Sequence, residues 1–185
     1  MRRVVAVESG FNPFAIGVVG GRLSRQPNNL QEALITAGQL EREGWNYSTG
    51  LAQINRVNFA RQGLTLESAF DPCRNLRASA AILAECFGRA RTARDEQGAL
   101  QAALSCYYSG DFRTGFRHGY VARILSAGGA EPPAMADPAR QTHRARPDAQ
   151  VPGIRVIPAS SPKFPVAQQP AVSTAIADDA SALIF

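Results

Sequence analysis

Apolar and polar positions alternate with helical spacing along much of the first 130 residues. Four stretches repeat an apolar residue every three or four positions. They begin near Leu30, Leu76, Leu100 and Phe112. This spacing predicts four amphipathic helices, because residues three and four apart share one face of an α-helix. The segments 10–21 and 44–50 are rich in glycine and aromatic residues instead, which predicts loops or short β-hairpins.

Capping residues mark where two of these helices begin. Asn29, with Glu32 three positions later, has the form of a capping box. Asp71 stands before Pro72, and a proline in the first helical position costs no hydrogen bond because that N–H is unpaired in any helix. These two signals therefore predict helix starts at positions 30 and 72.

The last helical stretch follows Asp111, which we interpret as its N-cap. Its apolar residues recur every four positions, at Phe112, Phe116, Tyr120 and Ile124. Gly128 supplies a C-terminal stop, so the pattern predicts one continuous helix. Together the elements predict a small, mainly α domain over residues 1–130, with a short irregular or β-hairpin region.

The composition changes after this domain. Nine of the 12 prolines lie in residues 131–185, whose only aromatic residues are Phe164 and Phe185. Such a segment forms no long helix and buries too little apolar surface to offset the entropy lost on ordering. We interpret residues 131–185 as a mostly disordered, Pro-rich tail.

The positive charge of the chain favours negatively charged partners. With 20 basic and 15 acidic residues, the net charge is +5, which fits a nucleic acid, an anionic membrane surface or an anionic cell-wall polymer. The arginines are scattered over the predicted helices and form no recognition motif, so we expect no nucleic-acid binding. We also expect no membrane insertion, because no stretch reaches the roughly 18 uninterrupted apolar residues that a spanning helix needs.

Glu8 is the first candidate for chemistry. It follows the apolar run Val4–Val7 and precedes Ser9, and a carboxyl among apolar groups favours its neutral, proton-donating form. The alternative, which is commoner on local sequence alone, is a solvated helix-end residue or an ion pair with Arg2 or Arg3.

Three further polar side chains lie in apolar surroundings. Gln53 lies within Gly50–Asn55, and Tyr107 and Tyr120 lie on predicted helices. An amide in this setting can bind a sugar hydroxyl or N-acetyl group, although structural glutamines and core tyrosines are commoner.

The order and spacing of these segments resemble those of the lytic transglycosylases with a goose-type lysozyme-like fold. The matching segments are Glu8-Ser9, Gly50–Asn55, Tyr107–Gly110 and Tyr120-Val121. The segments Gly10–Ile16 and Phe70–Leu76 resemble more particularly the transglycosylases encoded with type IV secretion systems. The resemblance covers residues 2 to about 126 and leaves the tail outside.

The resemblance implies a role for each matched residue. Glu8 matches the catalytic glutamate, a single acid and base, and Ser9 the serine that helps orient the sugar or the glutamate. Gln53 matches the glutamine that contacts the substrate, and Tyr107 the tyrosine of the Ala-Tyr-Asn-type motif. Tyr120 matches the tyrosine whose hydroxyl bonds the catalytic carboxyl.

The chain departs from the family motif at Tyr108, where the family usually has asparagine. A phenol lacks the paired donor and acceptor of an amide, so we assign no substrate contact to this position. The resemblance otherwise implies cleavage of the MurNAc–GlcNAc β-1,4 bond of peptidoglycan to 1,6-anhydro-muropeptides, with no cofactor. A hydrolysing lysozyme would need the same residues, and the sequence leaves this alternative open.

The cysteines and the start of the chain bear on metal binding and on the cellular compartment. The chain has three cysteines, Cys73, Cys86 and Cys106, whose spacing does not match a zinc site, so we expect no metal. Because the number is odd, their disulfide pairing stays open. The simplest interpretation is that all three are buried small hydrophobic residues. Exported relatives carry a signal sequence and a helix before the catalytic segment. The resemblance therefore implies a periplasmic protein, and we expect a truncated or mis-assigned start, with a fourth cysteine as one candidate feature of the missing part.

A second hypothesis assigns the chain no catalysis. It is then a peptidoglycan-binding assembly factor whose tail recruits type IV secretion channel proteins, and Tyr108 favours it slightly, while Glu8, Ser9 and Gln53 favour the enzyme.

Overall fold

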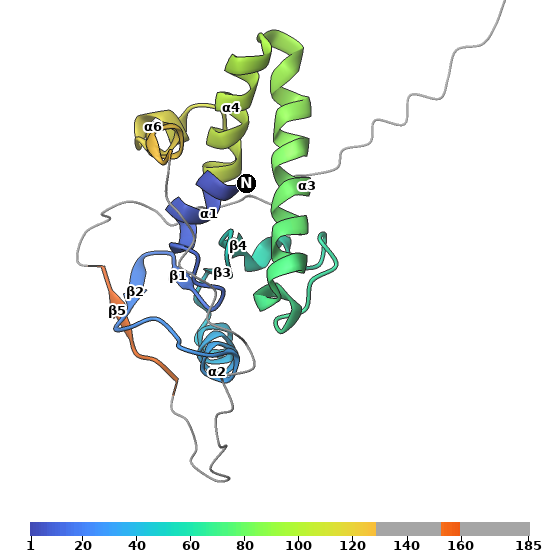
Figure 1. The fold of residues 1–185 in the computed structure, drawn as a ribbon. Helices are drawn as coiled ribbons and strands as arrows, with labels where there is room; N and C mark the ends of the chain where they lie inside the picture. The colour runs from blue at the N-terminus through green and yellow to red at the C-terminus, as the bar shows by residue number, and fades with distance from the viewer. Residues whose placement is uncertain (129–152, 160–185) are drawn as a thin grey trace, which may run out of the picture.

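The computed structural model describes residues 1–128 and 153–159, and it confirms a mainly α fold (Figure 1). Its helices are α1 (Arg2–Ser9), α2 (Leu30–Arg42), α3 (Pro72–Ala90), α4 (Glu96–Ser109), α5 (Thr114–Arg117) and α6 (Tyr120–Ser126). Its strands are β1 (Ile16–Val18), β2 (Gly21–Leu23), β3 (Tyr47–Thr49), β4 (Ile54–Asn55) and β5 (Val156–Pro158). None of the helices in these two ranges is both long and apolar enough to cross a membrane.

The strands form two small antiparallel sheets. In the first, β3 lies between β1 and β4, with Gly17 opposite Ser48 and Thr49 opposite Ile54. In the second, β2 pairs with β5. The glycine-rich segments 10–21 and 44–50, predicted as loops or hairpins, thus supply β1 and β3, and the first of them ends at the start of β2.

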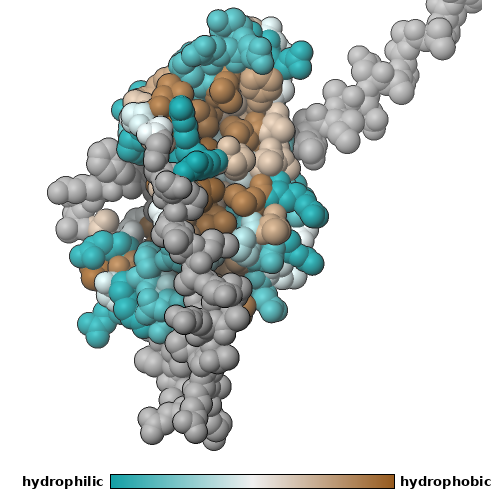
Figure 2. All heavy atoms as spheres, viewed as in Figure 1, coloured by the Kyte–Doolittle hydropathy of each residue, from teal (hydrophilic) through white to brown (hydrophobic). Residues whose placement is uncertain are grey.

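The two larger hydrophobic cores of the described structure divide it into two lobes. We call the first the helical lobe; α1, α3, α4 and α6 surround a core that includes Val4, Ile82, Leu104, Tyr107 and Ile124. We call the second the sheet lobe; α2 packs on β1, β2 and β3 around Ile16, Val18, Leu23, Leu40 and Tyr47. Figure 2 shows one face, where polar side chains cover the tip at which α3 meets α4 and apolar side chains gather over the middle.

The two predicted helix starts are confirmed. The Asn29 side chain accepts a hydrogen bond from the backbone N–H of Glu32, and the Asp71 side chain accepts one from that of Arg74. The capping box is incomplete, because the Glu32 carboxylate accepts from the N–H of Asn28 rather than from that of Asn29, and it also pairs with Arg25.

The prediction of one continuous helix after Asp111 is wrong. The chain forms α5 and α6, separated at His118 and Gly119, and Gly119 has a left-handed backbone with φ of 69°. Glycine adopts this conformation without strain, so the turn breaks the four-residue repeat. The Asp111 carboxylate accepts hydrogen bonds from the N–H groups of Arg113 and Thr114, but α5 begins at Thr114 with Arg113 as its N-cap, so the predicted N-cap position of Asp111 is also wrong. Phe116, expected on the apolar face, is 44% exposed.

One part of the predicted tail has a defined structure, while its other residues lie outside the described ranges. Residues 153–159 lie along β2 (Figure 1), where Arg155 accepts a hydrogen bond from the Ser24 N–H and Ala159 donates one to Gly20. Ile154 is buried in the core of the sheet lobe. The Pro-rich composition did not predict this docked strand.

The cysteines differ from the interpretation as three buried small residues. Cys86 of α3 and Cys106 of α4 form a disulfide, and both are buried. Cys73, near the start of α3, is an exposed free thiol.

Candidate active site

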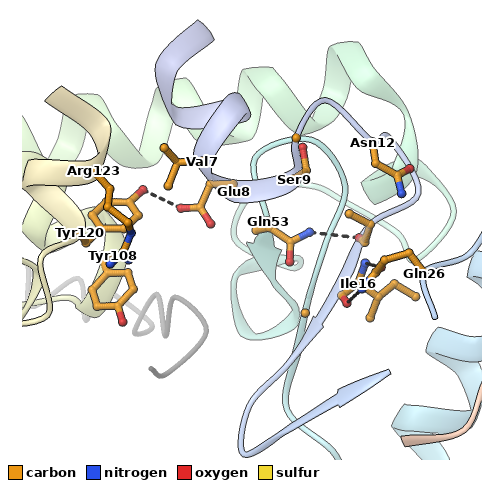
Figure 3. A pocket seen from close by; sticks show the side chains of 13 residues that line it. Val7, Glu8, Ser9, Asn12, Ile16, Gln26, Gln53, Tyr108, Tyr120 and Arg123 are labelled. Atoms are coloured by element: carbon orange, nitrogen blue, oxygen red, sulfur yellow. Dashed lines mark hydrogen bonds between the residues drawn. The ribbon is translucent and has the colours of Figure 1, made fainter. Parts of the chain in front are cut away.

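A cleft of about 370 Å³ separates the two lobes (Figure 3). The helical lobe contributes residues from α1, α4 and α6, and the sheet lobe contributes the turn after α1 and the start of β1. The lining residues are Val7, Glu8, Ser9, Gly10, Asn12, Ala15, Ile16, Gly17, Gln26, Gln53, Tyr108, Tyr120 and Arg123. Four of the five residues predicted for the site are among them.

Glu8 lies in the last turn of α1, and the helix ends because Gly10 adopts a left-handed conformation with φ of 57°. The hydrophobic residues before Glu8, Val4 and Val5, are buried and hold α1 in the helical lobe. The side chain of Glu8 is therefore presented at the cleft. Tyr120, at the start of α6, points toward it, and the Tyr120 hydroxyl donates a hydrogen bond to Glu8 Oε1 over 2.6 Å.

The surroundings of Glu8 favour its protonated form. Although the residue keeps part of its surface open to the cleft, desolvation of its carboxyl raises the pKa from 4.5 to about 7. The hydrogen bond from Tyr120 and the positive charge of Arg123 act in the opposite direction and lower this pKa. Near neutral pH, Glu8 can thus donate a proton and afterwards persist as a stabilised carboxylate.

The side chains of Ser9 and Gln53 donate hydrogen bonds to the backbone of segments that border the cleft. The Ser9 hydroxyl lies 2.7 Å from the carbonyl oxygen of Leu51, which ties the end of α1 to the turn between β3 and β4. The Gln53 amide nitrogen donates to the carbonyl oxygens of Ala15 and Gly50, over 3.1 and 3.0 Å. Gln53 has a positive φ of 50°, unusual for a residue with a side chain. Two hydrogen bonds orient its amide at the cleft.

Asn75 of α3 stabilises the turn that carries Gln53 through hydrogen bonds. The Asn75 amide donates to the carbonyl oxygens of Thr49 and Ala69 and accepts from the N–H of Ala52, and its side chain is fully buried. Gly50 lies against it with φ of 78°, where an added Cβ would be 2.7 Å from the Ala69 carbonyl oxygen. Only glycine fits this position.

Tyr107 lies behind the cleft rather than in its wall. It is fully buried, and its hydroxyl bonds the Ala52 carbonyl oxygen over 2.6 Å and Ser79 Oγ over 2.9 Å. The residue thus supports the Gln53 turn from the helical lobe.

Sequence reasoning did not single out Asn12, Gln26 or Arg123. Gln26 binds the backbone of Ile16 twice, accepting from its N–H and donating to its C=O, and so fixes the cleft edge of β1. Arg123 follows Tyr120 by three positions on α6, and this helical spacing is the signal that could have placed it near Glu8. Gln26 had no comparable signal, because its partner is a backbone ten residues away.

The cleft therefore offers one carboxylic acid with a raised pKa, one guanidinium, two phenols and several amides. Among the described residues, no three His, Cys, Asp or Glu side chains gather as a metal site. A small, mainly α domain that presents one desolvated glutamic acid in a cleft between two lobes is lysozyme-like.

The comparisons with known proteins identify the family. The family model "Transglycosylase SLT domain" matches residues 1–123, and the chain belongs to this family. It is 52% identical over 134 residues to the type IV secretion system protein virB1 of Brucella abortus biovar 1, an alignment that covers 69% of this chain and 56% of the relative. It is 37% identical over 126 residues to protein virB1 of Agrobacterium fabrum, covering 67% of this chain and 51% of the relative.

The chain thus spans about half the length of the curated relatives it matches. No solved structure is significantly similar to it.

Proposed function

We propose that this chain is a peptidoglycan lytic transglycosylase that cleaves the β-1,4 bond between MurNAc and GlcNAc. The observation that carries the proposal is the pair Glu8 and Tyr120, in which a desolvated carboxyl accepts a hydrogen bond from a phenol inside the cleft. Membership of the transglycosylase family and the size of the cleft support it.

In the proposed reaction, Glu8 acts twice. It first protonates the glycosidic oxygen, and the bond from that oxygen to C1 of MurNAc breaks. The C6 hydroxyl of the same MurNAc attacks C1 and closes the 1,6-anhydro ring. The proton of that hydroxyl passes to the Glu8 carboxylate, which restores the starting state without consuming water.

One carboxyl is sufficient for this chemistry because the substrate supplies its own nucleophile. A conventional glycosidase needs a second carboxyl, at about 5–9.5 Å from the first, as nucleophile or base. Among the residues that line the cleft, Glu8 is the sole carboxylic acid. Tyr120 and Arg123 both favour the carboxylate, so they stabilise Glu8 between the two proton transfers.

The other cleft residues have proposed roles in binding. Gln53 contacts the sugar through the part of its amide that the Ala15 and Gly50 carbonyl oxygens leave available. Ser9 and Tyr107 act indirectly, since both hydroxyls bond the backbone of the turn before Gln53.

Digestion of purified peptidoglycan tests the proposal. The chain is expected to release 1,6-anhydro-muropeptides, and Glu8→Gln is expected to fold and bind glycan but to release none. Glu67→Gln, which removes an exposed carboxylate outside the cleft, is the control. Binding of peptidoglycan without product from the wild-type chain would instead favour the assembly-factor hypothesis.

Digestion in ¹⁸O-labelled water separates the transglycosylase from a hydrolase. A hydrolase would introduce the label at the new reducing end, whereas ring closure by the C6 hydroxyl introduces none. Unlabelled anhydro products are the expected result.

We further propose a periplasmic location and a role in opening the cell wall for type IV secretion. The names of the virB1 relatives support the association with such a system. The part of the tail after residue 159, which we propose contacts secretion channel proteins, lies outside the described residues. Co-purification of channel proteins with the full chain, but not with a chain ending at residue 159, tests this contact.

A further inference from the structure

The residue after Tyr107 has an unexpected environment. Tyr108, on α4, lines the cleft, and its ring stacks on that of Tyr120 with centroids 4.6 Å apart and an interplanar angle of 21°. Stacked aromatic pairs have preferred relative orientations, so each ring restricts the other. Tyr108 therefore contacts the residue that bonds Glu8, while its own hydroxyl points away from the carboxyl (Figure 3).

His118 restricts Tyr108 in turn. The two rings meet edge to face at 5.9 Å, and the Tyr108 hydroxyl lies 3.4 Å from His118 Nδ1. His118 lies at the break between α5 and α6, directly before Gly119, and its carbonyl oxygen accepts a hydrogen bond from Arg123. The break that the sequence did not predict thus places a histidine beside this tyrosine pair.

Tyr120 needs such support because of its position on the chain. It is the first residue of α6, a helix of seven residues that follows the left-handed Gly119. Helix ends fray, so the orientation of the Tyr120 ring, which is 1% exposed in the core of the helical lobe, depends on side-chain packing more than on the short helix. The Tyr120 ring instead packs between elements, with Arg123 5.9 Å from its centroid and Tyr108 stacked on it.

We propose that Tyr108 is a positioning residue, whose ring, held by His118, keeps the Tyr120 hydroxyl aligned on Glu8. An asparagine, usual here in the resembling family, has no ring and cannot stack in this way. The inference rests on the proposed function only for its effect on turnover. Its effect on the carboxyl itself is independent of catalysis.

The experiment is a pH titration of the Glu8 carboxyl by NMR in glutamate-labelled protein, with the signal assigned by its loss in Glu8→Gln. In the described structure, the charged and titratable groups facing Glu8 are Tyr120 and Arg123 of α6 and Tyr108 of α4. Loss of the Tyr120 hydrogen bond removes an interaction that lowers the Glu8 pKa. Tyr108→Leu, which keeps an apolar side chain, is therefore expected to titrate at higher pH than wild type.

Two variants control for general damage. Tyr108→Phe keeps the ring, so its Glu8 carboxyl is expected to titrate at a pH close to that of the wild-type chain. Tyr47→Leu removes an equally buried ring from the sheet lobe and is expected to leave it unchanged. On peptidoglycan, Tyr108→Leu is expected to lower kcat roughly tenfold, with a smaller change in KM and the basic limb of the pH profile displaced upward.

The inference is overturned if Tyr108→Leu titrates as wild type, or if Tyr47→Leu shifts the Glu8 signal equally. If the titration responds as expected but the wild-type chain releases no anhydro product, the positioning role stands and the proposed function fails.

Discussion

The Tyr120 hydroxyl lies 2.6 Å from Oε1 of Glu8, although 112 residues separate them in sequence. The contact joins the last turn of α1 to the first residue of α6. It also opposes the effect of burial, since desolvation raises the Glu8 pKa and the phenol lowers it. The balance leaves a carboxyl with a pKa of about 7, suited both to donating and to accepting a proton.

Removing the phenol should disturb this balance in a defined direction. In Tyr120→Phe, desolvation remains while the hydrogen bond is lost, so the Glu8 pKa is expected to rise above about 7. The basic limb of the pH–rate profile moves upward with it, and kcat falls about 10- to 100-fold because the carboxylate loses a donor. Activity from pH 5 to 9 measures both, and a limb that stays in place would show that Tyr120 does not control Glu8.

Glu8 should also make the stability of the fold depend on pH. Its pKa is about 7 in the folded state against 4.5 for an ordinary glutamic acid, so between these values the folded state retains a proton that the unfolded state has lost. The contribution of Glu8 to the free energy of unfolding is therefore fully present below pH 4.5. It decreases as the pH rises to about 7 and is absent at higher pH.

Glu8→Gln removes this dependence, because its amide stays neutral. Above pH 7 the variant is expected to be more stable than wild type by up to about 3 kcal/mol, and the difference should shrink toward pH 4.5. Urea unfolding at pH 4.5, 6 and 8 measures it, with Glu67→Gln as control for the loss of a charge. A constant difference over this range contradicts a raised Glu8 pKa.

Local signals in the sequence predicted much of the fold. Asn29 and Asp71 cap α2 and α3 as expected, because a cap depends on residues within one turn. The break at Gly119 was missed since the four-residue repeat continues through it and only the backbone angle distinguishes the turn. The docking of Ile154 was missed because strand pairing over more than 130 positions leaves no local pattern.

Some features of the candidate site were likewise predictable from the sequence, and others were not. The apolar neighbours of Glu8 made it a candidate, but only the family resemblance favoured its role over a solvated glutamate and implied its pairing with Tyr120. The backbone-bound roles of Gln53 and Tyr107 depend on contacts with Ala15 and Ala52, which no local pattern reveals.

Asn75 should contribute strongly to stability. Its amide makes three hydrogen bonds to the backbone of two segments and is fully buried. Asn75→Ala leaves these backbone groups without partners, so we expect a loss of about 2–4 kcal/mol in urea unfolding. Asn28→Ala is the control, because the Asn28 side chain is exposed. Equal stability of the two variants would show that the turn does not depend on Asn75.

The disulfide between Cys86 and Cys106 should stabilise the pairing of α3 with α4. It closes a loop with a sequence separation of 20, for which the loss of unfolded-state entropy is worth about 3 kcal/mol. The double variant Cys86→Ala, Cys106→Ala is expected to lose about this much stability, and Cys73→Ser, at an exposed free thiol, is expected to lose little. Thermal unfolding without reductant compares them. An unchanged Tm in the double variant would contradict a native bond.

The strand formed by residues 156–158 should behave as part of the folded domain. Ile154, 5% exposed, fills the core of the sheet lobe, and its N–H donates to Thr36 Oγ1. Ile154→Ala is expected to cost about 2 kcal/mol and to speed amide exchange at Ser24, whose N–H bonds Arg155. Ile157→Ala, at a more exposed position on β5, is the control and should cost less. Rapid exchange at Ser24 in the wild-type chain would show that the segment is undocked in solution.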